Sequence, residues 1–346
     1  MTFVTFFVIL RYTQETFKGL SHRINAMAAK SIRTDLSQEF PYGYEHDSCA
    51  LYLSARKNGQ STFGTLKRAL WRLSNMGHRT GYVNGEGDGA GVQTDIPRGL
   101  WAKKMSRAGL PASLPTQPGF WVGHLIVPCG LEFSSIQEKI NQHFIQANLN
   151  LLLTQPGPVR TDALGLNAQF EAPSFWQLVG KTTPEDLEKR LFTVKIKLED
   201  ALPVHFASLS SYTVTYKIRG SVETLARYFP ELQDRSYDTI MALCHARYST
   251  NTVSNFERSQ PFALLGHNGE INTIDQFRRE ANQIGIQLPK NGSDSQDVDR
   301  ALEYFCIEQK MSLMQAMEII FPPTPYEVSH FAAPVQHGAS YWVREW

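Results

Sequence analysis

Two neighbouring segments, Leu243-Cys-His-Ala-Arg-Tyr-Ser-Thr-Asn-Thr252 and Ala263-Leu-Leu-Gly-His-Asn-Gly-Glu-Ile-Asn-Thr273, each join an apolar run to a dense polar cluster. The first apolar run, Thr239 to Leu243, leads to Arg247, Ser249 and Thr250. The second, Phe262 to Leu265, leads to Asn268 and Gly269. Apolar runs bounded by polar residues are typical of buried strands, so we expect two strands to end at one site.

The polar residues of this stretch indicate the chemistry of that site. Arg247 has a planar fork that suits a carboxylate. The Asn268 side chain and the backbone N–H of Gly269 are the donor types that stabilise an oxyanion. A carboxylate clamp beside an oxyanion hole suits an amino-acid amide or ester. The stretch contains no obvious nucleophile, so another part of the chain must supply one.

Composition limits the class of protein. The 346 residues are 42% hydrophobic and 19% charged, which is typical of a globular chain. The formal net charge of +1 gives no indication of a nucleic acid or an anionic membrane as partner. The 4 cysteines lack metal-type spacing, so no zinc or iron–sulfur site is expected. A reduced, cytoplasmic compartment is the expectation.

The first 48 residues allow two compatible interpretations. Phe3 to Leu10 is apolar but too short to span a bilayer, and it has neither the basic start nor the cleavage site of a secretory signal. In the first, the segment is a disordered leader, or follows an upstream start codon with Met27 as the true start; in the second, it is a propeptide that ends at Ser48.

Cys49 is the candidate nucleophile. It opens an apolar, strand-like run, where a lone cysteine is most often a small core residue. If Cys49 became the first residue, however, its own α-amine, with a pKa near 8, would be able to take the thiol proton. No separate catalytic histidine would then be required.

Two features follow the predicted helix Phe63 to Met76. Arg79 lies at the glycine-flanked helix exit, where it is either a C-terminal charge or a ligand-facing residue. The glycines of Gly85 to Gly91 match a dinucleotide fingerprint, but a helix precedes them and the strand Val92 to Ile96 follows. A dinucleotide site needs strand, turn and helix in that order, so we expect a tight turn packed close to the site instead.

The middle of the chain contains predicted strands and helices but no candidate site residue. Strands are predicted at Trp121 to Val127 and, from alternation, at Phe192 to Leu198, and a strand pair at Val204 to Leu209 and Tyr212 to Ile218. A short helix is predicted from Ser221 to Tyr228. The strands lack regular helical crossovers, which favours an antiparallel α+β fold.

The last part of the chain contains one further candidate residue. Helices are predicted at Ile274 to Ile284 and after Gly292. Asp294, which precedes the second of these helices, is either part of a helix cap or a carboxylate for an ammonium group. Residues 323–346 read as a tail, possibly the start of a further region.

Six blocks of the sequence resemble class II glutamine amidotransferases, and most of all the amidotransferase domain of the glutamate synthase large chain. They occur in the order seen in that family: His46-Asp47-Ser48-Cys49, Gly77-His78-Arg79, Gly87-Asp88-Gly89-Ala90-Gly91, Arg247-Tyr248-Ser249-Thr250-Asn251-Thr252, Gly266-His267-Asn268-Gly269-Glu270-Ile271-Asn272 and Ser293-Asp294-Ser295. The resemblance covers residues 45–322, and it implies a leader or propeptide over 1–48 and an amidotransferase domain over 49–322.

The resemblance implies an N-terminal-nucleophile hydrolase fold, a four-layer αββα sandwich of two mainly antiparallel sheets. It implies that Cys49 attacks the side-chain amide of L-glutamine and that Asn268 and the Gly269 N–H form the oxyanion hole. Arg247 would hold the substrate carboxylate and Asp294 its ammonium, and Thr250 and Arg79 would lie in or beside the pocket. Ammonia would pass to a synthase domain or subunit. No cofactor or metal is implied, because the flavin and iron–sulfur region of the synthases is absent from this sequence.

The sequence also departs from the family pattern. Ala50 stands where the family usually has glycine, and Leu51 to Ala55 and Gly81 to Val83 differ from the synthase sequences. The departures indicate a divergent branch. Two alternatives to an active glutaminase follow: a catalytically silent domain of the same fold that binds glutamine or a partner, and a hydrolase for a different amide.

Overall fold

A computed structural model describes residues 49–83, 85–247, 253–269, 271 and 273–322. The chain divides into two compact units between residues 272 and 273. In the described part of the chain, no helix is both long enough and apolar enough to cross a membrane.

The first unit contains two four-stranded sheets in which every pairing is antiparallel. The first sheet has the order β1 (Ala50–Ala55), β10 (Met241–Ala246), β4 (Ala90–Asp95) and β9 (Thr213–Ile218). The second has the order β6 (Leu151–Pro156), β7 (Ser174–Lys181), β5 (Phe120–Val127) and β8 (His205–Ser210). A small hairpin joins β2 (Tyr82–Val83) to β3 (Glu86–Gly87).

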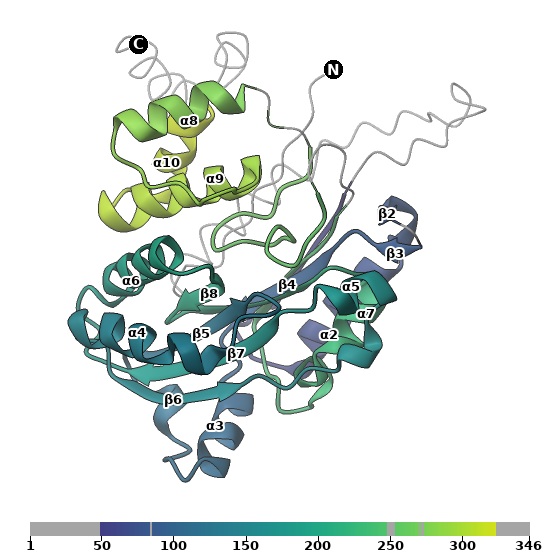
Figure 1. Cartoon of the computed structure of the whole chain (residues 1–346). Coiled ribbons are helices and arrows are strands. Elements are labelled where there is room, and N and C mark those ends of the chain that lie inside the picture. The colour runs from purple at the N-terminus through teal and green to yellow at the C-terminus, as the bar shows by residue number, and fades with distance from the viewer. Residues whose placement is uncertain (1–48, 84, 248–252, 270, 272, 323–346) are drawn as a thin grey trace. The chain divides into compact units, whose positions relative to one another are not determined.

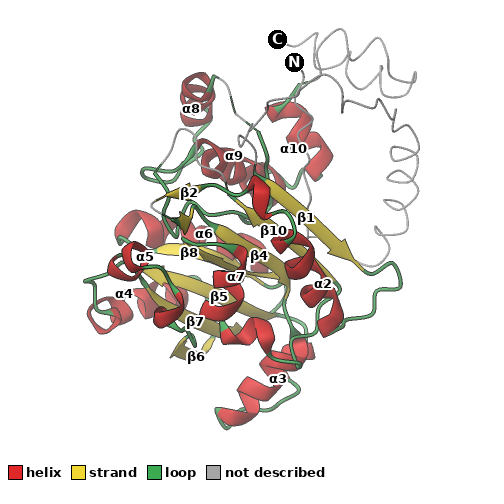
Figure 2. Cartoon of the chain, turned by 90° about the vertical axis from the view of Figure 1, so that its right-hand side faces the viewer, coloured by secondary structure: helices red, strands yellow, loops and turns green. Residues whose placement is uncertain are grey.

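Helices cover these sheets because their apolar residues recur at helical spacing. α4 (Phe133–Gln146) and α6 (Leu187–Ala201) pack on one face of the second sheet around a core that includes Ile140, Leu191 and Trp121 (Figure 1). α2 (Phe63–Ser74) packs on β1 and β10, and α7 (Val222–Tyr228) on β4 and β9 (Figure 2). The predicted α+β class with two antiparallel sheets, as in the N-terminal-nucleophile hydrolase sandwich, is confirmed.

The remaining helices of this unit are short. α3 (Arg98–Arg107) follows β4, and α5 (Leu166–Phe170) lies between β6 and β7 in the sequence. Single 3₁₀ turns occur at Gly77–Arg79, Leu114–Thr116, Thr161–Ala163 and Pro230–Gln233. The predicted cap of α7 is confirmed, because the Ser221 side chain accepts a hydrogen bond from the Thr224 backbone N–H.

The prediction of a strand at Phe192 to Leu198 is wrong, because this segment lies inside helix α6. The segment alternates over a few residues, but Leu187, Leu191, Val194 and Leu198 also recur at helical spacing over a longer window. All four side chains are buried in the core beneath the second sheet, so burial of the longer pattern decides the structure.

The predicted pairing of the segments around β8 and β9 is also wrong. Both are strands, but β8 pairs with β5 in the second sheet and β9 with β4 in the first. Side chains join the two strands instead: the Ser208 hydroxyl accepts from the Thr215 N–H at 3.0 Å, and His124 Nδ1–H donates to the Thr215 carbonyl at 2.9 Å. The two sheets are therefore linked along β8 and β9.

The second unit contains α8 (Ile274–Gln283), α9 (Asp294–Glu303), a π-helical turn at Tyr304–Glu308 and α10 (Leu313–Ile320). Both predicted helices are present. Ser293 caps α9 in a reciprocal capping box with Gln296, and Ser312 caps α10 in the same way with Gln315.

His124 makes the stability of the first unit depend on pH. Burial lowers the pKa of His124 from its ordinary 6.5 to about 4. The unfolded chain takes up a proton below about pH 6.5 while the folded chain does not, so stability is complete above that pH and falls below it. Because of this histidine, we expect the free energy of unfolding to fall by about 3 kcal/mol between pH 7 and pH 4.

The change that tests this is His124→Asn, which keeps a donor for the Thr215 carbonyl and does not titrate. Urea unfolding at pH 7 and pH 4 should show a smaller loss of stability on acidification in the variant than in the wild type. An equal loss in both proteins would contradict the role of His124.

Candidate active site

The pairing of β1 with β10 places the candidate nucleophile beside the candidate carboxylate clamp. Ala50 pairs with Ala246. Cys49 precedes Ala50, and Arg247 follows Ala246. Both residues therefore lie at the same end of two adjacent strands. Cys49 is half-buried and Arg247 is 7% exposed.

Hydrogen bonds to the backbone of two glycines fix the backbone of Arg247. The Arg247 N–H donates to the Gly89 carbonyl at 2.8 Å, and the Gly81 N–H donates to the Arg247 carbonyl at 3.0 Å. A Cβ on Gly91 would lie 2.3 Å from the Gln260 carbonyl oxygen, which only glycine avoids. The glycine-rich stretch is therefore the tight turn packed close to the site that the sequence predicts.

Arg79 is half-buried at the end of the 3₁₀ turn Gly77–Arg79. Its N–H donates to the Met76 carbonyl at 2.9 Å, as expected at a helix exit. The same segment continues to Gly81, which binds Arg247. The structure thus brings the Arg79 segment to the end of β10, and both interpretations of its side chain remain compatible with this position.

The prediction of a strand at Phe262 to Leu265 is wrong, because this segment is a loop. The Phe262 N–H donates to the Leu265 carbonyl at 2.9 Å, which closes a turn. The Gln93 side chain donates to the carbonyls of Phe262 at 2.7 Å and Ala263 at 3.1 Å. Because Pro261 has no N–H and a side chain satisfies these buried carbonyls, the segment is buried without a sheet ladder.

Further side chains anchor the loop 253–269 to the first sheet. Ser259 Oγ donates to the Ile218 carbonyl at 2.7 Å, and Lys217 Nζ donates to the Glu257 carbonyl at 2.8 Å. Gly266 also packs closely against the sheet, since a Cβ there would lie 3.1 Å from a Leu51 methyl carbon. The loop therefore lies against the sheet along its length.

The end of this loop carries Asn268 to the nucleophile. The His267 N–H donates to Gln260 Oε1 at 2.7 Å, and His245 Nε2–H donates to the His267 carbonyl at 3.0 Å. Asn268 Nδ2 then donates to the Cys49 carbonyl at 2.8 Å. The side-chain amide is thus held at the backbone of the candidate nucleophile.

Two further residues belong to this part of the site: Gly269, whose backbone conformation is unusual, and His245, whose ring holds the loop. Gly269 has a φ of +130°, a conformation that favours glycine, and it is exposed. Burial lowers the pKa of His245 to about 3, so this histidine is neutral at physiological pH. A neutral ring donates one hydrogen bond, and the position of the His267 carbonyl assigns that proton to Nε2.

Comparison with known proteins gives the family. The profile of the class II glutamine amidotransferases matches residues 49–341, which is most of the chain and begins at Cys49. The chain belongs to the class II glutamine amidotransferase family.

The curated relatives are glutamate synthases. The chain is 30% identical to the glutamate synthase [NADPH] large chain of Bacillus subtilis over 317 residues, which covers 81% of this chain and 20% of the relative. It is 28% identical to the glutamate synthase [NADH] of Saccharomyces cerevisiae, covering 81% and 15%. It is 31% identical to ferredoxin-dependent glutamate synthase 1 of Arabidopsis thaliana, covering 80% and 19%. The amidotransferase chain thus spans about a fifth or less of the length of these relatives.

Two predicted site residues of this amidotransferase are not part of the geometry above. Thr250 lies outside the described residues. Asp294 lies in the second unit, at the first position of α9, where its carboxylate accepts from the Ser295 N–H at 2.6 Å. This is the helix-start position that the sequence allows, and the ammonium-binding role stays a prediction.

The residues that hold the amidotransferase loop are absent from the sequence-based predictions. They are Gln93, Lys217, His245 and Gln260, which are all buried. Lys217 and His245 do give a signal, since each is a titratable residue inside an otherwise strand-like run. Such a residue needs a partner when it is buried, but the sequence does not say which one.

Lys217 is the anchor most open to test. Its ammonium donates to the Glu257 carbonyl and to His205 Nε2, both at 2.8 Å. Burial, followed by the Lys217 charge, lowers the pKa of His205, which keeps this ring neutral and able to accept. Glu199 lies 3.3 Å from His205 Nδ1 on the other side of the ring. The loop thus depends on a lysine held by a half-buried histidine.

We expect Lys217→Met to release the loop, because methionine keeps the apolar stem and loses the donor. Hydrogen exchange followed by mass spectrometry should show the amides of residues 253–262 exchanging about tenfold faster or more. Lys197→Met, at an exposed lysine of α6, is the matched control and should leave the rate unchanged. Equal rates in wild type and Lys217→Met would contradict the anchoring role.

Proposed function

We propose that this chain hydrolyses the side-chain amide of L-glutamine to glutamate and ammonia through a thioester on Cys49. The observation that carries the proposal is the hydrogen bond from Asn268 Nδ2 to the Cys49 carbonyl, at 2.8 Å. It supports the proposed role of Asn268 as an oxyanion donor, because it brings the Asn268 amide to the residue where the family match begins. The adjacent position of Arg247 supports a substrate with a carboxylate.

The proposed mechanism needs Cys49 as the first residue. Its α-amine takes the thiol proton, and Sγ attacks the amide carbon. Asn268 Nδ2 and the Gly269 N–H stabilise the resulting oxyanion. When the intermediate collapses, the C–N bond breaks and the amine returns its proton to the leaving nitrogen, which departs as ammonia. Water then cleaves the thioester, which releases glutamate and the free thiol.

The proposal assigns residues 1–48 as a leader or propeptide, 49–322 as the amidotransferase domain, and 323–346 as a tail. The family match from residue 49 supports the first boundary. Because the relatives are several times longer, we propose that the ammonia passes to a synthase domain or subunit outside this chain. A cytoplasmic location is part of the same proposal.

The alanine after the nucleophile does not argue against activity. Ala50 is fully buried and belongs to the core of the first unit, together with Val92 and Cys244. Its methyl group is therefore accommodated by core packing. The proposal of an active enzyme is favoured over a silent domain because the cysteine, the arginine and the oxyanion donors are all retained.

Asn268→Ala tests the oxyanion hole. In the chain that begins at Cys49, we expect kcat for ammonia release to fall about 10²- to 10³-fold with little change in KM, because the lost donor acts mainly in the transition state. Asn255→Ala is the matched control, since Asn255 lies in the same loop and its side-chain oxygen accepts from the Arg258 N–H at 2.8 Å. Equal losses in both variants would assign the effect to loop disruption.

Asp294→Asn tests the proposed ammonium contact. We expect KM for glutamine to rise about tenfold or more, with unchanged alkylation of the Cys49 thiol by iodoacetamide, because the lost charge acts on the substrate alone. Asp275→Asn, at an exposed aspartate of α8, is the control and should leave KM unchanged. Unchanged hydrolysis by Asp294→Asn at low glutamine would contradict the assignment.

A further inference from the structure

A cavity lies beside α3 in the first unit, away from the candidate active site. It has a volume of about 440 Å³ and is lined by residues of α3, the end of β6 and the 3₁₀ turn Pro230–Gln233. β4 begins at Ala90, next to the glycine that binds Arg247, and ends at Asp95, just before α3. A six-residue strand is about 17–20 Å long, so this cavity is separate from the Cys49 site.

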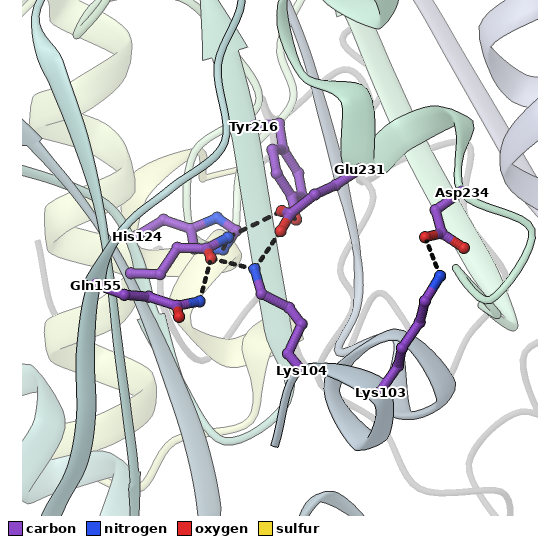
Figure 3. Close-up of polar contacts among 8 residues, drawn as sticks. Lys103, Lys104, His124, Gln155, Tyr216, Glu231 and Asp234 are labelled. Carbon is purple, nitrogen blue, oxygen red and sulfur yellow. Dashed lines mark hydrogen bonds and ion pairs between the residues drawn. The ribbon is translucent and has the colours of Figure 1, made fainter. Parts of the chain in front are cut away.

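A hydrogen-bond network lies beneath this cavity, and its members Lys104, Gln155 and Glu231 form the polar floor (Figure 3). The Lys104 ammonium donates to the Glu231 carboxylate and to the Gln177 side-chain oxygen. The other Glu231 oxygen accepts from Gln177 Nε2 at 2.8 Å and from the Tyr216 hydroxyl at 2.7 Å. Gln155, which lines the cavity, donates to Gln177 Oε1 at 3.3 Å.

The network makes the floor rigid before any ligand binds. Glu231 is 6% exposed and Tyr216 and Gln177 are fully buried, so their positions are fixed by packing as well as by hydrogen bonds. Lys104 also lies 4.4 Å from the centre of the Trp101 ring. A floor of this kind is preorganised, and a ligand would bind without the cost of ordering it.

The lining carries one positive charge that the carboxylates do not balance. Lys104 pairs with Glu231, and Lys103 pairs with Asp234 at 2.7 Å. Arg107, on the exposed last turn of α3, has no hydrogen-bond or ion-pair partner among the residues that the structure describes. Burial lowers the pKa of Lys104, and the nearby Arg107 charge lowers it further. An anion bound between these side chains would relieve that repulsion.

The residues that line the cavity indicate which class of anion would bind there. Leu100, Pro156, Pro158 and Pro230 supply apolar walls. A guanidinium fork binds a carboxylate through two parallel hydrogen bonds, and apolar walls favour a ligand with methylene groups over an inorganic ion. The dipole of α3 favours a cation at its last residue without any ligand, but it does not account for the cavity or for its rigid floor.

We propose that this cavity is a binding site for a small organic carboxylate, with the carboxylate held by Arg107 and the apolar body against the three prolines. The site takes its ligand independently of Cys49. It is a candidate for an effector site near the α3 end of β4, away from the nucleophile.

Calorimetric titration of the whole chain with succinate tests the proposal, with inorganic phosphate as the second probe at matched ionic strength. We expect wild type to bind succinate more tightly than phosphate. Arg107→Gln should weaken succinate binding about tenfold or more, since it removes a charged hydrogen-bond donor. Arg68→Gln is the matched control, because Arg68 is also an exposed helical arginine but does not line the cavity.

Four outcomes would overturn the proposal. They are no binding to wild type at about 10 mM succinate, tighter binding of phosphate, equal losses in the two arginine variants, and succinate binding that survives Arg107→Gln. The last result would place the carboxylate elsewhere, for example at Arg247. Because binding is measured directly, the outcome does not depend on whether Cys49 hydrolyses glutamine.

Discussion

The antiparallel register of β1 with β10 is the constraint on which the site depends. With Ala50 opposite Ala246, Cys49 and Arg247 leave the sheet together. A slip of one residue would reverse the face of every side chain on β1 and send Ala50 out of the core. Burial of Ala50, Cys244 and Ala246 in one cluster opposes such a slip. Core packing thus fixes the positions of Arg247 and of Cys49, which is itself only half-buried.

The second half of the site depends on a different kind of interaction. The segment that carries Asn268 has no sheet ladder, and buried side chains satisfy its backbone instead. Each such hydrogen bond contributes only about 1 kcal/mol net, but a buried carbonyl left without a partner costs about 1–3 kcal/mol. The anchors therefore act together, and residues 253–268 of the loop have one well-defined path that ends at Cys49.

Local pattern predicts the parts of this fold that local pattern determines. The helix at Phe63–Ser74 has apolar residues at helical spacing and a polar face. The glycine turn before β4 follows from the order of elements, which excludes a dinucleotide site. The segment Phe192 to Leu198 satisfies both strand and helix periods, so only the core beneath the second sheet decides it. The path of the loop after Pro261 depends on Gln93, which is far away in the sequence, and single-sequence patterns contain no record of that partner. The candidate nucleophile, clamp and oxyanion donors could be named from the sequence because family motifs carry them, and their roles stay predictions, whereas their buried supports could not be named.

The intact mass of the purified chain after incubation with a glutamine analogue tests the role of Cys49 most directly. The analogue carries an electrophilic diazoketone in place of the amide. The predicted result is a chain that begins at Cys49 and carries one adduct, mapped to Cys49 and blocked by excess glutamine. A chain that retains residues 1–48 yet reacts equally well, or an adduct on Cys129 or Cys306, would contradict the proposal that Cys49 is an N-terminal nucleophile for glutamine.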